Sequence, residues 1–230
     1  PQEYNEVNVG GTVALMAAVR DVGVPRVVLA SSATVYGNQP RQPVHEGLAP
    51  HPQAPYAVSK IAAEHYLFSL GALYRSQAVA LRIFNAYGPG QRVAPAHAPV
   101  VPLFFRRALG GGSLVIHGDG SQSRDFVHID DVVAAITAAA TTPDVDGRII
   151  NVGSGVETSI NDLVRQVAMV TGKMPSVLYN EAQQGGVARL VADLTLAGQV
   201  LGYAPKVALL DGLRRLLALD PQFARWSIAK

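Results

Sequence analysis

The stretch Arg26-Val27-Val28-Leu29-Ala30-Ser31-Ser32-Ala33-Thr34-Val35-Tyr36-Gly37 indicates how this chain folds. Its first residues form a short apolar run, which is typical of a strand that is buried on both faces. Polar residues begin at Ser31, where that strand is expected to end. Because ligands bind outside the carboxyl ends of strands in an open parallel sheet, we expect Ser31 and Ser32 to lie at a ligand site.

A tyrosine and a lysine follow in the stretch Tyr56-Ala57-Val58-Ser59-Lys60. Residues four apart on a helix share one face and lie one turn apart. A lysine ammonium beside a phenol stabilises the phenolate, so we expect Lys60 to lower the pKa of Tyr56. Together with a serine hydroxyl group from the neighbouring strand end, this pair suits removal of a proton from an alcohol while a hydride leaves the carbon. The alternative is an exposed tyrosine and lysine on a helix surface.

Helix and strand patterns alternate along the first part of the chain and predict an α/β fold. Helices are expected over residues 9–22 and 56–74, and the next strand over residues 78–83. This alternation is typical of a parallel sheet with right-handed connections and helices on both faces. The intervening residues 39–55 hold five prolines and are expected to form an ordered loop.

The remaining sequence is less regular and predicts a smaller lobe. Residues 93–102 are rich in proline and alanine, and we expect them to cross to the substrate side. Helices are predicted over residues 101–109, 130–140, 160–170 and 209–219, and strands over residues 113–117 and 148–152. Asp130 and Asp131 suit the positive N-terminal end of their helix, and Ser159 is the expected cap of the helix that follows it.

Composition favours a globular protein and excludes several other classes. The 230 residues are 49% hydrophobic and 16% charged, which is enough for one good core. No apolar run approaches a membrane span and the first residues are polar, so we expect no membrane contact and a cytoplasmic location. The net charge of +2 with scattered basic residues does not suggest nucleic-acid binding. The chain has no cysteine, and we predict no metal site.

Five motifs occur in order along most of the chain. They are Asn8-Val9-Gly10-Gly11-Thr12, the string from Ser31 to Gly37, Tyr56-Ala57-Val58-Ser59-Lys60, Leu81-Arg82-Ile83-Phe84-Asn85-Ala86-Tyr87-Gly88-Pro89-Gly90-Gln91, and Gly118-Asp119-Gly120-Ser121-Gln122-Ser123-Arg124-Asp125-Phe126-Val127-His128. In these motifs the chain resembles the extended short-chain dehydrogenase/reductases, and among them the UDP-sugar 4-epimerases. The resemblance implies a partial Rossmann-like parallel sheet with a small α/β substrate lobe.

The resemblance also implies a division into two parts. Residues 1–89 correspond to the C-terminal part of a Rossmann-like NAD-binding domain, and residues 90–230 mainly to a sugar-nucleotide-binding lobe, with 125–155 returning to the sheet. The family begins with a strand, a Gly-rich turn and a helix that hold the dinucleotide pyrophosphate. This chain has no such pattern after an N-terminal strand, and its first residues already match a region well inside the family. We therefore expect a member without the adenine-binding half, whether fragment, truncated product or degenerate form, with one strand left as an open edge.

The function that this resemblance implies is NAD-dependent epimerisation at C4 of a nucleotide-diphosphate sugar through a 4-keto intermediate. One alternative is a catalytically inactive homologue that binds a sugar nucleotide or a partner chain. A sugar 4,6-dehydratase is disfavoured, because dehydratases have an Asp-Glu pair where this chain has Ala33-Thr34. We expect a homodimer through the helices at 9–22 and 56–74, or association through the open sheet edge.

By resemblance, Tyr56 is the catalytic acid/base, Ser32 is the catalytic serine, and Lys60 also holds the nicotinamide ribose. The other predicted cofactor contacts are Asn8, Ser31 and Phe84. Ordinary structural roles stay open for these three residues: a helix start for Asn8, capping of the strand end for Ser31, and core packing for Phe84.

The resemblance also implies a set of substrate contacts. These residues are Ser32, Asn85, Val100, Val115, His117, Arg124 and Arg189. Arg124 corresponds to an arginine that binds the nucleotide diphosphate, and its alternative is an ion pair with Asp125 or Asp130. A second family arginine is replaced here by Gln183 and Gly186, with Arg189 as the candidate substitute. For His117 the alternative is a solvent-facing side chain.

Overall fold

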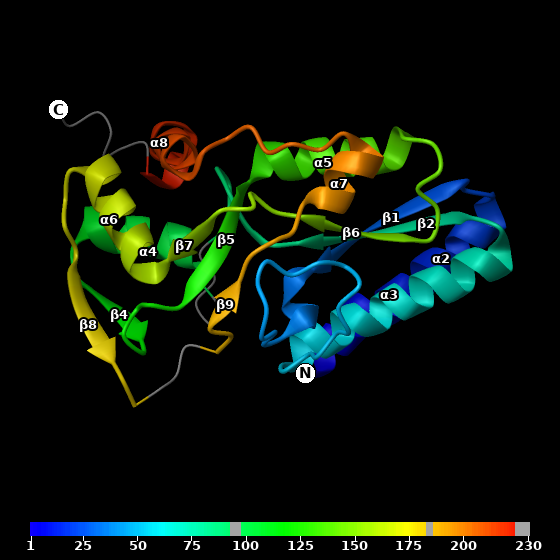
Figure 1. Cartoon of the computed structure of the whole chain (residues 1–230), viewed down its shortest axis with the longest axis horizontal. Coiled ribbons are helices and arrows are strands. Elements are labelled where there is room, and N and C mark those ends of the chain that lie inside the picture. Colours follow the sequence, from blue (N-terminus) through cyan, green and yellow to red (C-terminus); the bar gives the residue numbers. More distant parts are fainter. Residues whose placement is uncertain (93–97, 183–185, 224–230) are drawn as a thin grey trace.

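The computed structural model describes residues 1–92, 98–182 and 186–223. In Figure 1 one part of the molecule is built around β1, β2 and β6, and the other around α4, α6, β4 and β8. Gln183 and residues 93–97, on which two expectations depended, lie outside the described residues. None of the helices within the described ranges is both long and apolar enough to cross a membrane.

The first part contains a parallel sheet with strand order β1 (Arg26–Ser32), β2 (Gln77–Ile83) and β6 (Arg148–Val152). β2 is the central strand, and its side chains alternate between two hydrophobic clusters. Ala78 and Ala80 belong to one cluster, and Val79 and Leu81 to the other. The predicted α/β class is confirmed, and Ser31 and Ser32 form the last two residues of β1 rather than following it.

Helices cover both faces of this sheet (Figure 1). On one face α2 (Gly11–Val22) packs beside α3 (Pro55–Tyr74), and their side chains join the cluster that contains Ala78 and Ala80. On the other face lie α5 (Ile129–Thr141) and α7 (Thr195–Leu201). Gly23 ends α2 with φ of 76°, which is the left-handed conformation expected of a C-terminal glycine.

The N-terminal helix is longer than the sequence predicts. α1 (Gln2–Tyr4) and the π-helical turn η1 (Asn5–Gly10) run directly into α2, so the helical path begins at Gln2 rather than at Val9. Most side chains in the added segment are exposed and polar, so they give no apolar periodicity that could reveal the helix. The extension brings Tyr4 beside α3.

The edge of the sheet at β1 is open. Among the described residues β1 pairs with β2, and no strand is hydrogen-bonded to its other side. Residues 27–29 of β1 are half-buried, whereas residues 78–82 of β2 are buried. This arrangement agrees with the expected open edge.

The loop after β1 is held against β6. It begins with the 3₁₀ turn η2 (Ala33–Tyr36) and reaches α3 without another helix. Asn151 of β6 is its anchor: the Asn151 side chain accepts a hydrogen bond from the Tyr36 hydroxyl at 2.7 Å and donates one to the Val44 carbonyl at 2.9 Å. The backbone amide of Asn151 also donates a hydrogen bond to the Glu46 carboxylate at 2.7 Å. The prediction of an ordered loop is thus supported by its contacts.

The second part contains two smaller sheets. One is built from β3 (Asn85–Tyr87), β5 (Ser123–His128), β7 (Glu157–Ser159) and β9 (Arg189–Leu190). The other is the parallel pair β4 (Ser113–His117) and β8 (Ser176–Asn180). The sequence pattern predicted β4 with its correct bounds but did not predict β3, β5, β7, β8 or β9. These five strands are short and carry mixed polar and apolar residues.

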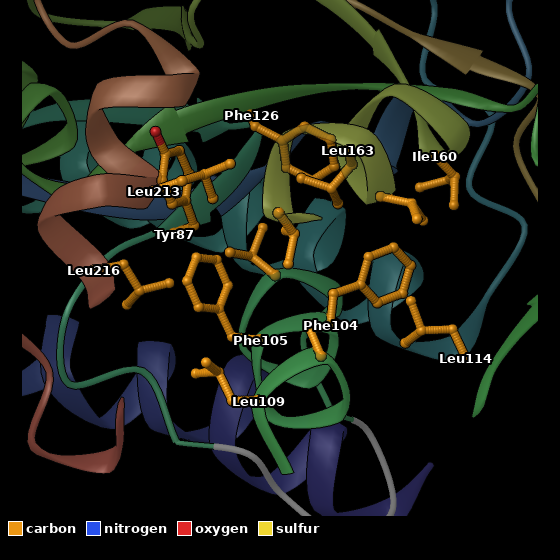
Figure 2. Close-up of a cluster of buried hydrophobic side chains, with 14 of the residues drawn as sticks. Tyr87, Phe104, Phe105, Leu109, Leu114, Phe126, Ile160, Leu163, Leu213 and Leu216 are labelled. Carbon is orange, nitrogen blue, oxygen red and sulfur yellow. The ribbon is translucent and has the colours of Figure 1, made fainter. Parts of the chain in front are cut away.

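Three helices enclose the core of this second part. They are α4 (Val100–Gly110), α6 (Ile160–Thr171) and α8 (Leu209–Leu219), all within one residue of the predicted bounds. Figure 2 shows Phe104 and Phe105 of α4 among side chains that include Phe126 and Leu213. The Ser159 hydroxyl accepts a hydrogen bond from the Asp162 amide at 3.0 Å and caps α6 as expected.

Candidate active site

The carboxyl end of β1 meets the first turns of α3, and this meeting brings Ser32 to Tyr56. Hydrogen bonding to the Ser32 side chain lowers the pKa of Tyr56, while burial of the phenol has the larger effect and raises it. The net pKa of Tyr56 is above its ordinary value, because a phenolate loses solvation in this half-buried position. The expected proximity of the two hydroxyl groups is therefore seen.

Lys60 lies one turn after Tyr56 and contacts its ring. The Lys60 Nζ is 5.8 Å from the centroid of the Tyr56 ring and donates a hydrogen bond to the Ala30 carbonyl at 3.0 Å. Burial lowers the pKa of Lys60. The expected lowering of the Tyr56 pKa is not seen in this arrangement, because the ammonium points to a carbonyl of β1 and desolvation of the phenol prevails.

Ser32 has two local contacts in addition to Tyr56. Its Oγ lies 2.9 Å from the Thr34 Oγ1 and accepts a hydrogen bond from the Thr34 amide at 3.3 Å. Ser32 therefore caps η2 and interacts with the phenol at the same time. Thr34 itself was not among the predicted site residues, although it lies within the same motif and its side chain is exposed.

The hydroxyl group of Ser31 points to α3. It donates a hydrogen bond to Glu64 Oε1 at 2.5 Å, and Glu64 forms a buried ion pair with Arg82 of β2. The role of Ser31 as a cofactor contact stays a prediction, since its hydroxyl group is engaged by a carboxylate. Sequence reasoning missed Glu64 and Arg82. The available signals were the position of Glu64 four residues after Lys60 and a charged residue inside an apolar strand.

The two other predicted cofactor residues are Asn8 and Phe84. Asn8 donates a hydrogen bond to the Ser59 hydroxyl at 3.0 Å, which in turn donates to the Tyr56 carbonyl at 2.8 Å. Asn8 thus contacts α3 as well as belonging to the N-terminal helix. Phe84 is 5% exposed and packs in a cluster with Tyr36, which is the core-packing role that the sequence left open.

Five of the predicted substrate residues line one cavity of about 400 Å³. They are Asn85, Val100, Val115, His117 and Arg124. Apolar side chains from α4, β4 and α6 complete the wall, among them Phe104 and Ile160. Small-molecule sites typically occupy about 300–1,000 Å³ and combine such apolar walls with a few polar groups. The cavity therefore has the size and lining of a ligand site.

The two predicted phosphate-binding arginines have different surroundings. Arg124 is half-buried in the cavity wall and donates a hydrogen bond to the Ser123 carbonyl at 2.7 Å. Arg189 lies on the neighbouring strand β9 and forms two hydrogen bonds of 2.7 Å with the Glu157 carboxylate. This contact, with a hydrogen bond from Ser123, lowers the pKa of Glu157 to about 2. The guanidinium fork of Arg189 is thus already engaged.

Asp125 and Asp130, the two acids proposed as ion-pair partners of Arg124, both have other contacts. Asp125 is buried and accepts hydrogen bonds from the Ser154 amide and hydroxyl and from the Gly155 and Ala192 amides. Asp130 pairs with Arg215 at 3.1 Å. These contacts give both carboxylates structural roles in fixing the loops around β5.

Comparison with known proteins places these features in a family. Residues 1–153 match the NAD dependent epimerase/dehydratase family. The UDP-glucose 4-epimerase of Mycolicibacterium smegmatis is 40% identical over 210 residues, which are 91% of this chain and 66% of that protein. A putative UDP-glucose 4-epimerase of Methanocaldococcus jannaschii is 33% identical over 218 residues, covering 94% of this chain and 70% of that protein.

Solved structures give the same result. The Thermotoga maritima UDP-glucose 4-epimerase with UDP-glucose has a TM-score of 0.86 at 33% identity, over 92% of this chain and 68% of that one. The Thermus thermophilus UDP-glucose 4-epimerase complex with NAD has a TM-score of 0.85 at 33% identity, over 98% and 71% of the two chains. This chain spans about two thirds of the length of the curated relatives that it matches. The family match and these relatives show that the chain belongs to the NAD dependent epimerase/dehydratase family.

Proposed function

We propose that this chain carries the catalytic and substrate-binding residues for NAD-dependent epimerisation at C4 of a UDP-linked sugar. The observation that carries the proposal is the meeting of Tyr56, Ser32 and Lys60 at the carboxyl end of β1. The nearby cavity that Asn85 and Arg124 help to line supports the substrate class. The names of the similar proteins, which are UDP-sugar 4-epimerases, support it further.

The donor groups at the end of β1 fit the nicotinamide half of NAD. Lys60 supplies an ammonium group and Tyr56 a hydroxyl group on one face of α3, and two such donors suit the neighbouring hydroxyl groups of a ribose. Lys60, Tyr56 and Asn8 are the residues that would hold this half. When bound, NAD supplies the acceptor for the C4 hydride and returns it to the other face of the sugar.

The protein residues then have to orient and deprotonate the C4 hydroxyl group. Ser32 can hydrogen-bond the substrate oxygen, and Tyr56 takes its proton and later returns it. At neutral pH the raised pKa keeps Tyr56 protonated, so the acceptor role requires a positive charge closer to the phenol. Lys60 can supply this charge by turning from the Ala30 carbonyl to the Tyr56 oxygen.

The cavity suits the nucleotide end of the substrate. Arg124 offers a guanidinium group of the geometry that diphosphate oxygens require. Val115 and His117 lie on β4 at the same wall, where an apolar surface and a ring nitrogen can contact a nucleoside. Phe104 and Ile160 keep water from part of this surface because both side chains are buried. Which sugar is accepted depends on groups near Ser32 and Asn85.

We further propose a cytoplasmic homodimer. Several apolar side chains of α2 and α3 are exposed on the face away from the sheet, among them Leu15, Val58 and Leu73 at 54%, 50% and 70%. A second copy could bury these side chains against its own α2 and α3. Size-exclusion chromatography with light scattering tests the dimer, and a monomer at micromolar concentration would contradict it.

The deciding experiment combines turnover with binding. The full-length, unsubstituted protein is incubated with UDP-glucose and NAD, and formation of UDP-galactose is measured by chromatography. We expect Tyr56→Phe to lower turnover by about 10²–10⁴-fold, because the proton can no longer be transferred, and to leave UDP-glucose affinity nearly unchanged. Near-normal turnover of the variant would refute the assignment of Tyr56. Binding without turnover in the unchanged protein would support the inactive homologue instead.

A further inference from the structure

Three consecutive residues at the end of β1 are each connected to one face of α3. The connected pairs are Ala30 with Lys60, Ser31 with Glu64, and Ser32 with Tyr56. The three α3 residues are spaced by four, so they form a single row along the helix. Two of the pairs belong to the proposed catalytic set, whereas the Ser31–Glu64 pair has no part in the proton transfer described above.

Glu64 continues into a buried ion pair. Its carboxylate accepts hydrogen bonds from the Arg82 Nε at 3.0 Å and from the Arg82 Nη2 at 2.8 Å. The side chains of Glu64 and Arg82 are both 2% exposed. Arg82 lies directly beside Ser31 in the register of β1 and β2, so α3 is joined to two adjacent strands at one level of the sheet.

A buried ion pair of this kind contributes little net stability to a protein core. Removing two charges from water costs several kcal/mol per ion, and apolar residues of similar volume often serve stability equally well. Arg82 Nη1 is also buried without a hydrogen-bond partner among the described residues. The Tyr36 ring, whose centroid is 4.7 Å from the guanidinium carbon, offsets part of this cost. Such a pair does give a sharp orientation, because a two-pronged contact allows little rotation.

We propose that Glu64 and Arg82 are positioning residues that fix the rotation of α3, and thereby hold Tyr56 against Ser32 and keep Lys60 on the same face of the helix, within reach of the phenol. This inference rests on the proposed function of Tyr56 and Lys60. Apolar packing of α3 on the sheet tolerates small rotations, whereas the guanidinium–carboxylate fork does not. A rotation of the helix moves every side chain in the row, so an error at Glu64 is passed on to the phenol.

A double substitution separates orientation from stability. Glu64→Leu/Arg82→Met replaces the pair by apolar side chains of similar volume, while Arg82→Met alone leaves a buried carboxylate without its cation. We expect the double variant to unfold at nearly the temperature of the unchanged protein. If the pair has only a structural role, the double variant should recover both the activity and the stability that Arg82→Met loses. If the pair positions α3, the double variant should recover the stability alone.

Two readouts report the orientation in the double variant. The first is the Tyr56 titration, followed by NMR of ¹³Cζ-labelled tyrosine and assigned with Tyr56→Phe. We expect its midpoint to fall, since burial is the main effect that raises it and a turned α3 exposes the phenol. The second is kinetics: kcat should fall by about 10²-fold while KM for UDP-glucose stays unchanged, because the cavity lies on other elements.

A matched control removes an exposed pair with the same net charge change. Asp211→Ala/Arg214→Ala deletes a 2.8 Å ion pair on α8, and both readouts should stay as in the unchanged protein. If the double variant fails to fold, Glu64→Gln/Arg82→Gln takes its place, since it removes both charges and leaves neither ion buried without its partner. An unchanged Tyr56 midpoint or an unchanged kcat in a folded variant overturns the inference.

The test also distinguishes this inference from the proposed function. If the unchanged protein has no turnover, the epimerase assignment fails, and the Tyr56 midpoint alone then decides whether Glu64 and Arg82 set the position of the phenol. If turnover is present and the midpoint does not move, the assignment of Tyr56 stands and the positioning role is lost.

Discussion

Two arginine–glutamate pairs in this protein have nearly the same geometry and very different surroundings. Arg82 and Glu64 form two hydrogen bonds of 3.0 and 2.8 Å beneath the Tyr56 site, and both side chains are 2% exposed. Arg189 and Glu157 form two hydrogen bonds of 2.7 Å near the proposed substrate cavity. The Arg189 side chain is 57% exposed and the Glu157 side chain 37%. The same contact is therefore a fixed part of the core in one place and an exchangeable surface contact in the other.

The difference fits the task that is proposed for each region. Proton transfer needs the phenol of Tyr56 at a set distance from its partners, and buried contacts supply that constraint. Binding of a nucleotide needs charge that can be redirected to phosphate oxygens, and an exposed guanidinium group can exchange its partner at little cost. The comparison can be tested by treating the two pairs in the same way.

The largest difference is expected in stability. Arg82→Met should lower the free energy of unfolding by about 3–5 kcal/mol, because Glu64 is then a buried charge without its counter-ion. Arg189→Met should lower it by at most about 1 kcal/mol, since water replaces the lost partner of Glu157. Urea denaturation of both variants, followed by circular dichroism, measures the two values. Equal losses would show that burial does not separate the pairs.

Nucleotide affinity should show the next largest effect, and it distinguishes the two arginines near the cavity. Arg124→Met should weaken UDP binding by about 10- to 150-fold, which corresponds to the loss of a charged hydrogen bond of about 1.5–3 kcal/mol. Arg189→Met should weaken it less, because Arg124 lines the cavity whereas Arg189 is not among the described residues that line it. Isothermal titration with UDP measures both. A greater loss for Arg189→Met would reverse the assignment of the phosphate contact.

The smallest effect concerns acid stability. The pKa of Glu157 is lowered from 4.5 to about 2 in the folded protein, so the contribution of this carboxylate is present above pH 4.5 and is lost as the pH falls toward 2. Glu157→Gln should therefore unfold at a lower temperature than the unchanged protein at pH 6, with a difference that shrinks by pH 3. Calorimetry at the two values measures it. A difference that does not change with pH would mean that the charge of Glu157 is not involved.

Local sequence patterns were sufficient for the first sheet and for α2, α3 and α5, but they missed α7 and the helical segment before α2. The apolar runs of β1 and β2 lie on both faces of a parallel sheet, and Gly23 stops α2 where expected. The Tyr56–Ser32 contact also followed from sequence, because a strand end and a helix start that are joined by one loop meet at the same edge.

Contacts between distant elements could not be predicted in this way. Glu64 and Arg82 are 18 residues apart, and their pairing depends on the rotation of α3 over the sheet. The carbonyl that holds Lys60 has no side chain to mark it in the sequence, so the direction of the ammonium group and the raised pKa of Tyr56 were missed. The short strands of the second part depend on partners far along the chain for the same reason.

We expect the hydroxyl group of Thr34 to give the site a route for protons that does not pass through the substrate. Tyr56 contacts Ser32, Ser32 lies 2.9 Å from the Thr34 hydroxyl with either group able to donate, and the Thr34 side chain reaches solvent. The Tyr4 ring meanwhile covers Tyr56 edge-on, with centroids 5.5 Å apart. We therefore expect the acidic hydrogen of Tyr56 to exchange with deuterium oxide through this hydroxyl chain, so that Tyr56 can release its proton to bulk water before it accepts one from the substrate.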